Sequence, residues 1–350
     1  MAARLLNLIA LSSFLILASN FGPSPVTALS IDSSAHQVRH LGHHQLIAKK
    51  KRSNTGRCKP RPSSSSVVHH STSSVAVVHT TPHPTTSKAA APKPTPAPSN
   101  NAPANTGHGG NGKVGIAWAM GDDPSLKNFV TSKVSTVYTW SPFKPSQVDQ
   151  LGLDFAAMLW GTKQIGDFVN LVKPGYARYA LAFNEPDIQG QSNLDPGYAA
   201  SLWKQYLEPL KAHGYTLISP AVTSGPGGKP WLQSFLGACS GCSVDNIALH
   251  WYGTDPQAFI SYVEDFHNTF KKNIWVTEFA CQSFVSSVPQ CSASQVTNFM
   301  NTVTAWMDST SYVSKYFAFG VMHDMQGVNP LDQLMAANGQ PTELGWNYLT

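Results

Sequence analysis

Two glutamates, Glu185 and Glu278, each follow a short run of β-forming residues. Glu185 lies in Leu181-Ala-Phe-Asn-Glu-Pro-Asp187, where Pro186 must end the strand because proline has no N–H to donate to a sheet. Glu278 lies in Ile274-Trp-Val-Thr-Glu-Phe-Ala280. Two carboxyl groups that face each other can cleave a glycosidic bond, one as the acid and the other as the nucleophile or base. The pair is therefore a candidate for that chemistry.

Eight β-rich runs at near-regular spacing supply the elements that must position these glutamates. Between most of the runs lie helix-like stretches, such as 198–213 and 294–307, and this alternation predicts a parallel sheet. The glutamates are 93 positions apart, and a (β/α)8 TIM barrel spends about 31 residues per strand–helix unit. Three units thus separate them, which suits the C-terminal ends of strands four and seven. The expected strands are Val114–Trp118, Val134–Trp140, Phe155–Trp160, Tyr179–Phe183, Tyr215–Ser219, Ile247–Trp251, Ile274–Glu278 and Tyr316–Val321.

An open, doubly wound α/β sheet is the alternative fold. It is less favoured because no glycine-rich phosphate loop follows the first expected strand. The fold class expected is thus an α/β (β/α)8 barrel.

His250 and Tyr252 lie at the end of the expected sixth strand, next to the strand that carries Glu278. Alternation along a strand places both side chains on one face and Trp251 on the other. If that face is the barrel interior, both can donate hydrogen bonds to Glu278, orient it and keep its pKa low. The alternative is that both residues serve only in packing.

Several expected strands end in tryptophan, and Trp118 and Trp160 are the better candidates for a surface on which a sugar ring stacks. The alternative for any single tryptophan is ordinary packing in the core or at the top of the barrel.

The first 111 residues differ in composition from the rest. An apolar run over 5–18 after Arg4, followed by Val26-Thr-Ala28, predicts a cleaved signal peptide, with an uncleaved membrane anchor as the alternative. The net charge of +5 is placed largely near Lys49–Arg52, where the dibasic Lys51-Arg52 suggests processing rather than nucleic-acid binding. The expected organisation is signal peptide 1–28, basic pro-segment 29–52, disordered Ser/Thr/Pro-rich linker 53–111 and catalytic domain 112–350.

Five cysteines are present, four of them in the expected domain. In an oxidising compartment these four should form two disulfides, and Cys239–Cys242 with Cys281–Cys291 keeps each bridge within one loop. A four-cysteine zinc site is the rival, which a secreted location disfavours. No metal or other cofactor is expected.

Three motifs together, Phe183-Asn-Glu-Pro-Asp187, His250-Trp-Tyr252 and Trp275-Val-Thr-Glu-Phe279, resemble glycoside hydrolase family 128 of the fungal type. The resemblance covers 112–350. It implies a retaining endo-β-1,3-glucanase that acts on cell-wall glucan without a cofactor. It also implies Glu185 as acid/base, Glu278 as nucleophile, and Asn184 as the contact to the sugar 2-hydroxyl.

Two other classes of function compete with a secreted or wall-bound glucanase. One is a carbohydrate-binding barrel without catalysis, and the other is a structural wall protein whose Ser/Thr/Pro-rich linker, 53–111, carries the function. Within the enzyme class, β-1,4-glucan and mannan are the alternative substrates, because one barrel serves many glycans. The expected partner is a β-glucan polysaccharide, with no nucleic acid, no membrane once the leader is removed, and a monomeric chain.

Overall fold

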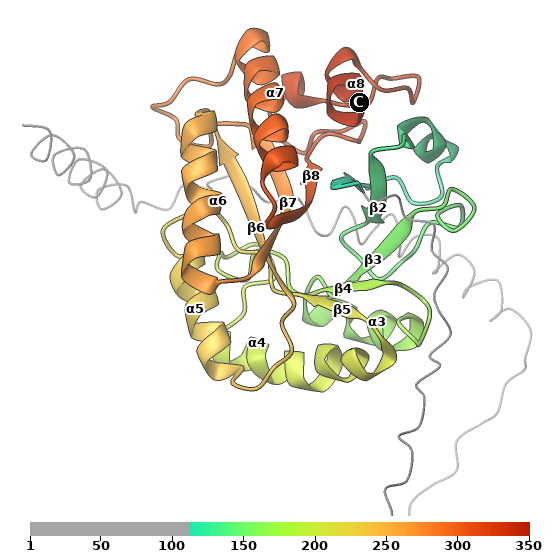
Figure 1. The fold of residues 1–350 in the computed structure, drawn as a ribbon, viewed down its shortest axis with the longest axis vertical. Helices are drawn as coiled ribbons and strands as arrows, with labels where there is room; N and C mark the ends of the chain where they lie inside the picture. The colour runs from blue at the N-terminus through green and yellow to red at the C-terminus, as the bar shows by residue number, and fades with distance from the viewer. Residues whose placement is uncertain (1–111) are drawn as a thin grey trace, which may run out of the picture. The chain divides into compact units, whose positions relative to one another are not determined.

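The computed structural model of the protein describes residues 112–350 (Figure 1). The expected signal peptide, pro-segment and linker, 1–111, lie outside the described residues and stay predictions. Within 112–350, no helix combines the length and the apolar character that a bilayer-spanning segment needs.

Eight parallel strands close into a barrel in sequence order, so the expected (β/α)8 fold is confirmed. Each strand pairs with the next along the chain, and β1 pairs with β8. The strands are β1 Val114–Ala117, β2 Val134–Tyr138, β3 Asp154–Met158, β4 Tyr179–Leu181, β5 Thr216–Ile218, β6 Asn246–Gly253, β7 Asn273–Cys281 and β8 Val313–Ala318. Every expected strand overlaps an observed one, and the expected strands differ from the observed ones mainly in the residues at which they begin and end.

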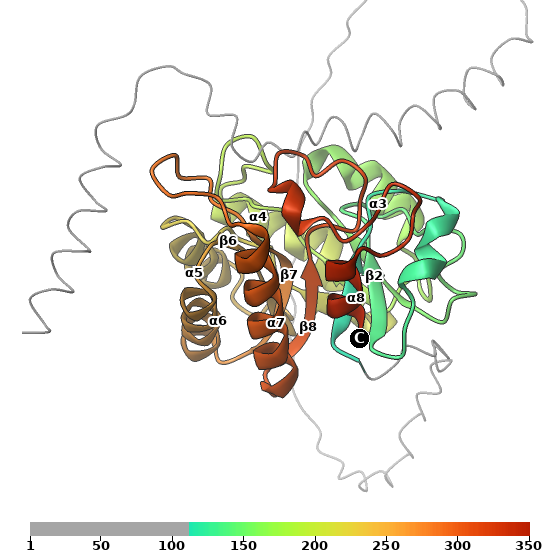
Figure 2. The ribbon, with the colours of Figure 1, turned by 90° about the horizontal axis from the view of Figure 1, so that it is seen from above.

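Helices surround the strands (Figures 1 and 2). The α-helices are α3 Ile165–Leu171, α4 Pro196–Leu202, α5 Gly228–Ala238, α6 Pro256–Phe270, α7 Ala293–Ser309 and α8 Glu343–Leu349. Shorter helices are η1 Pro124–Phe129, η2 Thr162–Gln164, η3 Trp203–Leu207, η4 Glu208–His213 and η5 Pro330–Asp332. In the described part of the chain, the β1–β2 connection contains only η1 and the β2–β3 connection contains no helix.

The expected single helix over 198–213 is wrong in detail. The α-helix α4 ends at Leu202, a π-helical turn η3 follows, and the 3₁₀ helix η4 completes the segment. Pro209 has no N–H for the hydrogen bond that would continue an α-helix. The backbone hydrogen bonds therefore change from the α-helical pattern to the π-helical and 3₁₀ patterns around it.

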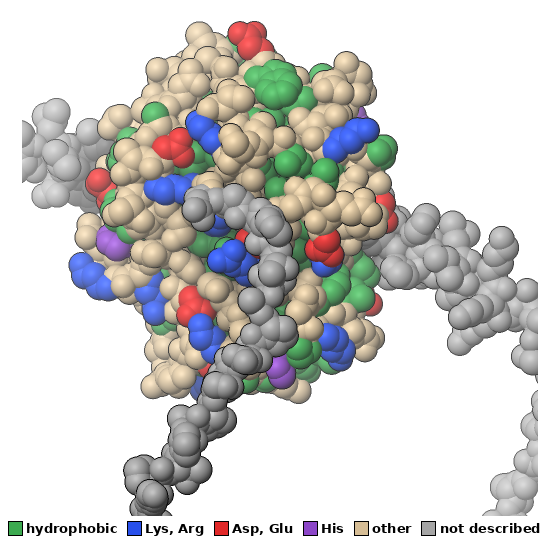
Figure 3. Space-filling view, turned by 45° about the vertical axis from the view of Figure 1, so that its right-hand side comes forward, with side chains coloured by type: hydrophobic (Ala, Val, Ile, Leu, Met, Phe, Trp, Pro, Cys, Tyr) green, Lys and Arg blue, Asp and Glu red, His purple; other side chains and the backbone are tan. Residues whose placement is uncertain are grey.

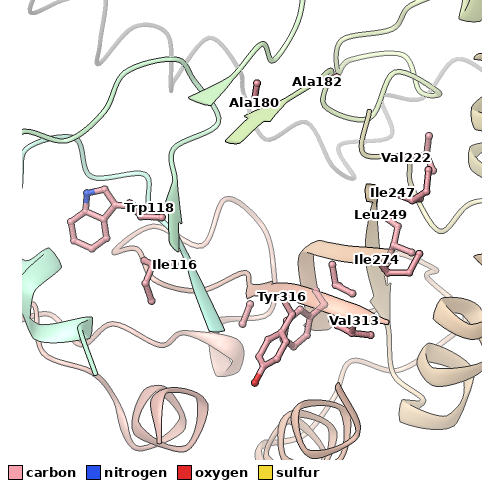
Figure 4. Packing of buried hydrophobic residues seen from close by; sticks show 14 of the residues in the cluster. Ile116, Trp118, Ala180, Ala182, Val222, Ile247, Leu249, Ile274, Val313 and Tyr316 are labelled. Atoms are coloured by element: carbon pink, nitrogen blue, oxygen red, sulfur yellow. The ribbon is translucent and has the colours of Figure 1, made fainter. Parts of the chain in front are cut away.

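Two apolar layers fill the fold. One, between strands and helices, includes Ile116, Leu249 and Tyr316 (Figure 4), and the other, inside the barrel, includes Tyr138, Met158 and Phe317. Alternation of side chains along each strand separates the two layers.

Both expected disulfides, Cys239–Cys242 and Cys281–Cys291, are present.

On the face drawn in Figure 3, lysine and arginine side chains are interspersed with aspartate and glutamate, without a large patch of one sign.

The seam between β1 and β8 is one of two thin seams of the barrel. Its register has one strand pair, Val114 with Tyr316, as the register of β5 with β6 does. The buried Tyr348 of α8 reinforces the seam, because its hydroxyl donates to the carbonyl oxygens of Gly115 (2.7 Å) and Tyr316 (3.0 Å) and accepts from the N–H of Ala318 (3.1 Å).

We predict that Tyr348→Phe lowers the free energy of unfolding by about 1–3 kcal/mol, because it leaves buried backbone groups without a partner. Urea denaturation measures the change. Tyr198→Phe, at a tyrosine that is 52% exposed, is the control and should change the stability by less than about 0.5 kcal/mol. Equal stability of the two variants would show that the hydroxyl does not reinforce the seam.

Candidate active site

Glu185 lies just beyond β4, where the strand pairing continues although the regular strand has ended. Its N–H donates to the carbonyl of Ala221 (2.8 Å), and the N–H of Asn184 donates to the carbonyl of Trp160 (3.0 Å). Glu185 adopts a φ of 40°, in the left-handed region that side chains other than glycine rarely enter. Such strain is found where neighbouring structure fixes a functional side chain. Here it accompanies a carboxyl group that is buried at the barrel mouth.

Glu278 reaches the barrel interior because β7 contains a bulge. Leu249 of β6 pairs with Val276, but the next residue, His250, pairs with Glu278. The register with β8 also gains one residue over the same stretch of β7. Strict alternation from the inward-facing Trp275 would turn Glu278 outward, and the extra residue, Thr277, reverses this.

The hydroxyl of Tyr138 donates to the carbonyl oxygen of Thr277 (2.8 Å). A bulge interrupts the ladder of backbone hydrogen bonds, so a side-chain partner for this buried carbonyl helps to stabilise it.

Two donors hold the Glu278 carboxylate. The hydroxyl of Tyr252 donates to Oε2 (2.6 Å) and the indole N–H of Trp140 donates to Oε1 (2.7 Å). The first contact was expected from the sequence. The contact from Trp140 was not predicted. Trp140 ends an expected strand, as Trp118 and Trp160 do, but the sequence does not reveal the φ of 51° on which the direction of its side chain depends.

His250 joins the two glutamates. Its Nδ1 lies 2.9 Å from Oε1 of Glu185, and its Nε2 lies 3.5 Å from Oε1 of Glu278. The expected face and the proximity to Glu278 are confirmed, but the hydrogen-bonded partner is Glu185. All three side chains are essentially inaccessible to solvent.

Burial sets the protonation of the pair. It raises the pKa of Glu185 to about 8, with a smaller contribution from the charge of Asp187. Burial also raises the pKa of Glu278, whereas His250, Tyr252 and Trp140 act in the opposite direction. The expectation that donors keep the pKa of Glu278 low is therefore wrong, because desolvation outweighs them.

Asn184 and Gln191 form a polar edge beside Glu185. The side-chain amide of Asn184 donates to Oε1 of Gln191 (3.1 Å), and Oδ1 of Asn184 is buried without a hydrogen-bond partner. Gln191 was not among the expected site residues, because nothing in its local sequence marks it. A buried acceptor without a partner can accept a hydrogen bond from a hydroxyl group of a ligand.

The two tryptophans expected to stack on sugar differ in position. Trp118 is fully buried, packs against Phe129 and donates its indole N–H to the carbonyl of Gly121 (2.8 Å). It points into the layer outside the strands (Figure 4), so no sugar can stack on it and this expectation is wrong. Trp160 belongs to the layer inside the barrel and remains 8% exposed, so its role stays a prediction.

Other aromatic rings pack against the two donors to Glu278. Phe319 lies 5.8 Å from the ring of Trp140 and 6.0 Å from that of Tyr252, measured between centroids. Phe284 also packs against Tyr252, at 5.4 Å. These contacts fix the orientation of both donors to the carboxylate.

Glu185, His250 and Glu278 also form the described group that could hold a metal ion, with one ligand atom from each lying within 4.8 Å of the others. Two carboxylates and an imidazole suit a divalent cation. The donors Trp140 and Tyr252 already point at both oxygens of Glu278, an arrangement that serves an ionised carboxylate without a cation as well.

Comparisons with known proteins agree with this geometry. The model of the family described as "Glycosyl hydrolase catalytic core" matches residues 115–348. Alkali-sensitive linkage protein 1 of Schizosaccharomyces pombe is 31% identical over 246 residues, which cover 68% of this chain and 44% of that protein. The chain thus spans less than half the length of this relative.

Solved structures of glycoside hydrolase family 128 match the chain over most of their own length. An exo-β-1,3-glucanase from Aureobasidium namibiae is 28% identical with a TM-score of 0.61, over 69% of this chain and 96% of that one. An endo-β-1,3-glucanase from Sorangium cellulosum is 29% identical with a TM-score of 0.59, over 68% and 98%. An oligosaccharide-binding protein from Cryptococcus neoformans is 29% identical with a TM-score of 0.58, over 70% and 94%. With the buried pair of glutamates in a closed barrel, these matches mean that the chain is a glycoside hydrolase and belongs to family 128.

Proposed function

We propose that this glycoside hydrolase is a secreted endo-β-1,3-glucanase that acts on cell-wall glucan by a retaining, double-displacement mechanism. The observation that supports it best is the buried pair of Glu185 and Glu278, bridged by His250. One oxygen of each carboxyl group and a nitrogen of His250 lie within 4.8 Å of one another. Inverting enzymes need carboxyl groups about 6.5–9.5 Å apart to accommodate a water molecule, so this spacing favours retention.

In the first step, Glu278 attacks the anomeric carbon while Glu185 protonates the leaving oxygen. Both carboxyl groups lose hydration, but only Glu278 accepts hydrogen bonds from Tyr252 and Trp140. These donors favour negative charge on Glu278, so the proton of the pair resides on Glu185, whose pKa is raised to about 8.

In the second step, the Glu185 carboxylate removes a proton from a water molecule while the water oxygen bonds to the anomeric carbon and the bond from that carbon to Glu278 breaks. The two inversions leave the sugar with its original configuration. His250 contacts both carboxyl groups, and burial lowers its pKa, so the imidazole is neutral. A neutral imidazole orients Glu185 without neutralising the charge that Glu278 needs for attack. The buried Oδ1 of Asn184 would accept a hydrogen bond from the 2-hydroxyl of the sugar.

The substrate class is supported by the solved relatives, which include both endo- and exo-acting β-1,3-glucanases. A glucan-binding barrel without catalysis is the second candidate, because an oligosaccharide-binding protein matches the chain almost as well. The product profile on purified β-1,3-glucan, β-1,4-glucan and mannan tests the proposal. Oligosaccharides of several lengths from β-1,3-glucan alone support it, whereas binding without products would identify a lectin.

The two glutamates should respond differently to substitution. Glu278→Gln keeps the shape of the side chain but cannot form the glycosyl–enzyme bond, so turnover should fall by more than the roughly 10²–10⁴-fold typical of losing an acid–base group. Glu185→Ala should still form the intermediate from an activated aryl β-glucoside, and added azide should release it as a β-glycosyl azide.

Configuration of the azide product by NMR is the decisive measurement. An α-azide from Glu185→Ala would mean that the two roles are reversed, and full activity of Glu278→Gln would remove this residue from the chemistry.

The pH profile of kcat/KM should be bell-shaped. Activity should be lost above about pH 8 as Glu185 loses the proton that it must donate, and lost at low pH as Glu278 becomes protonated. Tyr252→Phe removes a donor that favours ionised Glu278, so the pKa of Glu278 rises and the acidic limb moves up by about 1–2 pH units. The alkaline limb should stay in place.

Tyr198→Phe, at the exposed tyrosine, is the matched control and should leave both limbs unchanged. A shift of the alkaline limb alone in Tyr252→Phe would contradict the assignment of Glu278 as the group that must be ionised.

A further inference from the structure

The loop between β7 and α7, residues 282–290, stands beside the candidate active site and has no part in the mechanism above. It begins four residues after Glu278 on the same strand. Its Phe284 packs against Tyr252, with ring centroids 5.4 Å apart, and Tyr252 donates to Glu278. One side of the loop is thus continuous with the group that holds the proposed nucleophile.

The loop is fixed at both ends. The Cys281–Cys291 disulfide closes it. The side chain of Asp332 accepts from the N–H of Cys281 (3.0 Å), and the side-chain amide of Asn329 donates to the carbonyl of Cys291 (3.0 Å). These bonds tie the loop to η5, and a loop held in this way loses little entropy when it binds a ligand.

The polar side chains of the loop are used within it. Gln290 exchanges two hydrogen bonds with the backbone of Ser283, and the hydroxyl of Ser283 bonds to the backbone of Val285. Gln282 accepts from the N–H of Asn329 (2.6 Å) and donates to the carbonyl of Ser283 (2.6 Å). The outward surface carries the apolar Val285 and Val288 together with small or neutral polar side chains, Ser286, Ser287 and Gln290.

Exposed apolar residues gather here. Val285 is 57% exposed, Val288 42%, and Leu331 of the adjoining η5 48%. These are three of the six large apolar side chains that are exposed in the described part of the chain. Figure 2 shows the β7–α7 loop in orange and the segment after β8 in red at the same end of the barrel. We call Phe284, Val285, Val288 and Leu331 the apolar rim.

Charge decides which occupant the apolar rim fits. Residues 282–290 contain no charged side chain, so neither a charged polymer nor an acidic or basic peptide has a partner there. The loop also lines a wide, shallow surface hollow of about 460 Å³. A neutral chain with apolar C–H faces matches the chemistry of this surface, and the shallow hollow leaves it open to such a chain.

We infer that the apolar rim is an accessory subsite that holds the part of a β-glucan chain extending beyond the cleavage site, with Phe284 linking it to the catalytic centre. This inference rests on the proposed function. It predicts that long chains gain more from the rim than short substrates do, because only a long chain reaches from Glu278 to Val285 and Val288.

Val285→Ser/Val288→Ser tests the rim, because both side chains are exposed and the change should not affect folding. The value of kcat/KM on a long soluble β-1,3-glucan should fall about tenfold, since apolar contact area is lost. Activity on an activated aryl β-glucoside should stay within twofold. Val169→Ser changes a valine of α3 that is equally exposed (42%) and should leave both activities unchanged.

Leu331→Ser is a second variant, at the exposed rim residue of η5. It too should lower activity on the long glucan and spare the short substrate. Equal losses on both substrates would overturn the inference, because they would show that the change acts on the catalytic centre or on folding rather than on a distant part of the chain. Unchanged activity of the double variant would overturn it as well.

Binding separates this inference from the proposed function. The Glu278→Gln variant, with and without Val285→Ser/Val288→Ser, is run in affinity gels that contain the long glucan. Weaker retardation of the triple variant supports the rim even if the native chain shows no turnover. Equal retardation, or self-association of the native chain that the double substitution abolishes in sedimentation, would overturn the inference and assign the patch to contacts between copies.

Discussion

The placement of His250 between two buried carboxyl groups is the constraint on which the site depends. A buried carboxylate loses the hydration that stabilises its charge, and two of them close together also repel each other. Burial raises the pKa of Glu185 to about 8, which favours its protonated form, and Tyr252 and Trp140 donate hydrogen bonds to Glu278. Because His250 contacts both groups, the state of either carboxyl group affects the other. In the mechanism that we propose, the difference between acid and nucleophile thus arises from their neighbours rather than from residue type.

The barrel supplies this arrangement through two departures from regular geometry. Glu185 has a left-handed φ, and Thr277 forms a bulge that turns Glu278 inward. Glu185 lies just beyond the end of β4, whereas Thr277 lies inside β7, which continues to Cys281. A bulge can redirect side chains without ending a strand. The hydroxyl of Tyr138 contacts the bulge from inside the barrel. Residues of the inner layer therefore position the site as well as stabilise the barrel.

Much of this could be predicted from the sequence, because hydrophobic runs and prolines act locally. The eight strands, the position of Glu185 just beyond its strand and the Tyr252 contact follow from spacing and alternation, and the disulfides follow from the short loops that separate the cysteines. What failed depends on tertiary structure. Trp118 and Trp140 both follow barrel strands, yet one packs outside the strands and the other contacts Glu278. No local pattern distinguishes them. The raised pKa of Glu278 likewise reflects complete burial, which spacing does not reveal.

In the proposed function, the pair of Glu185 and Glu278 and the apolar rim contribute to recognition through two kinds of surface. Inside the mouth, the two glutamates would act through charge in a site without solvent, where small displacements are costly. Outside, Val285 and Val288 offer apolar area without directional bonds, which suits the neutral polymer that we propose as substrate. Phe284 connects the two surfaces because its ring packs against that of Tyr252, with centroids 5.4 Å apart. The Cys281–Cys291 disulfide closes the loop that carries the rim valines and so limits how far they can move from Glu278. In our proposal, that span sets the length of glucan needed to contact both surfaces.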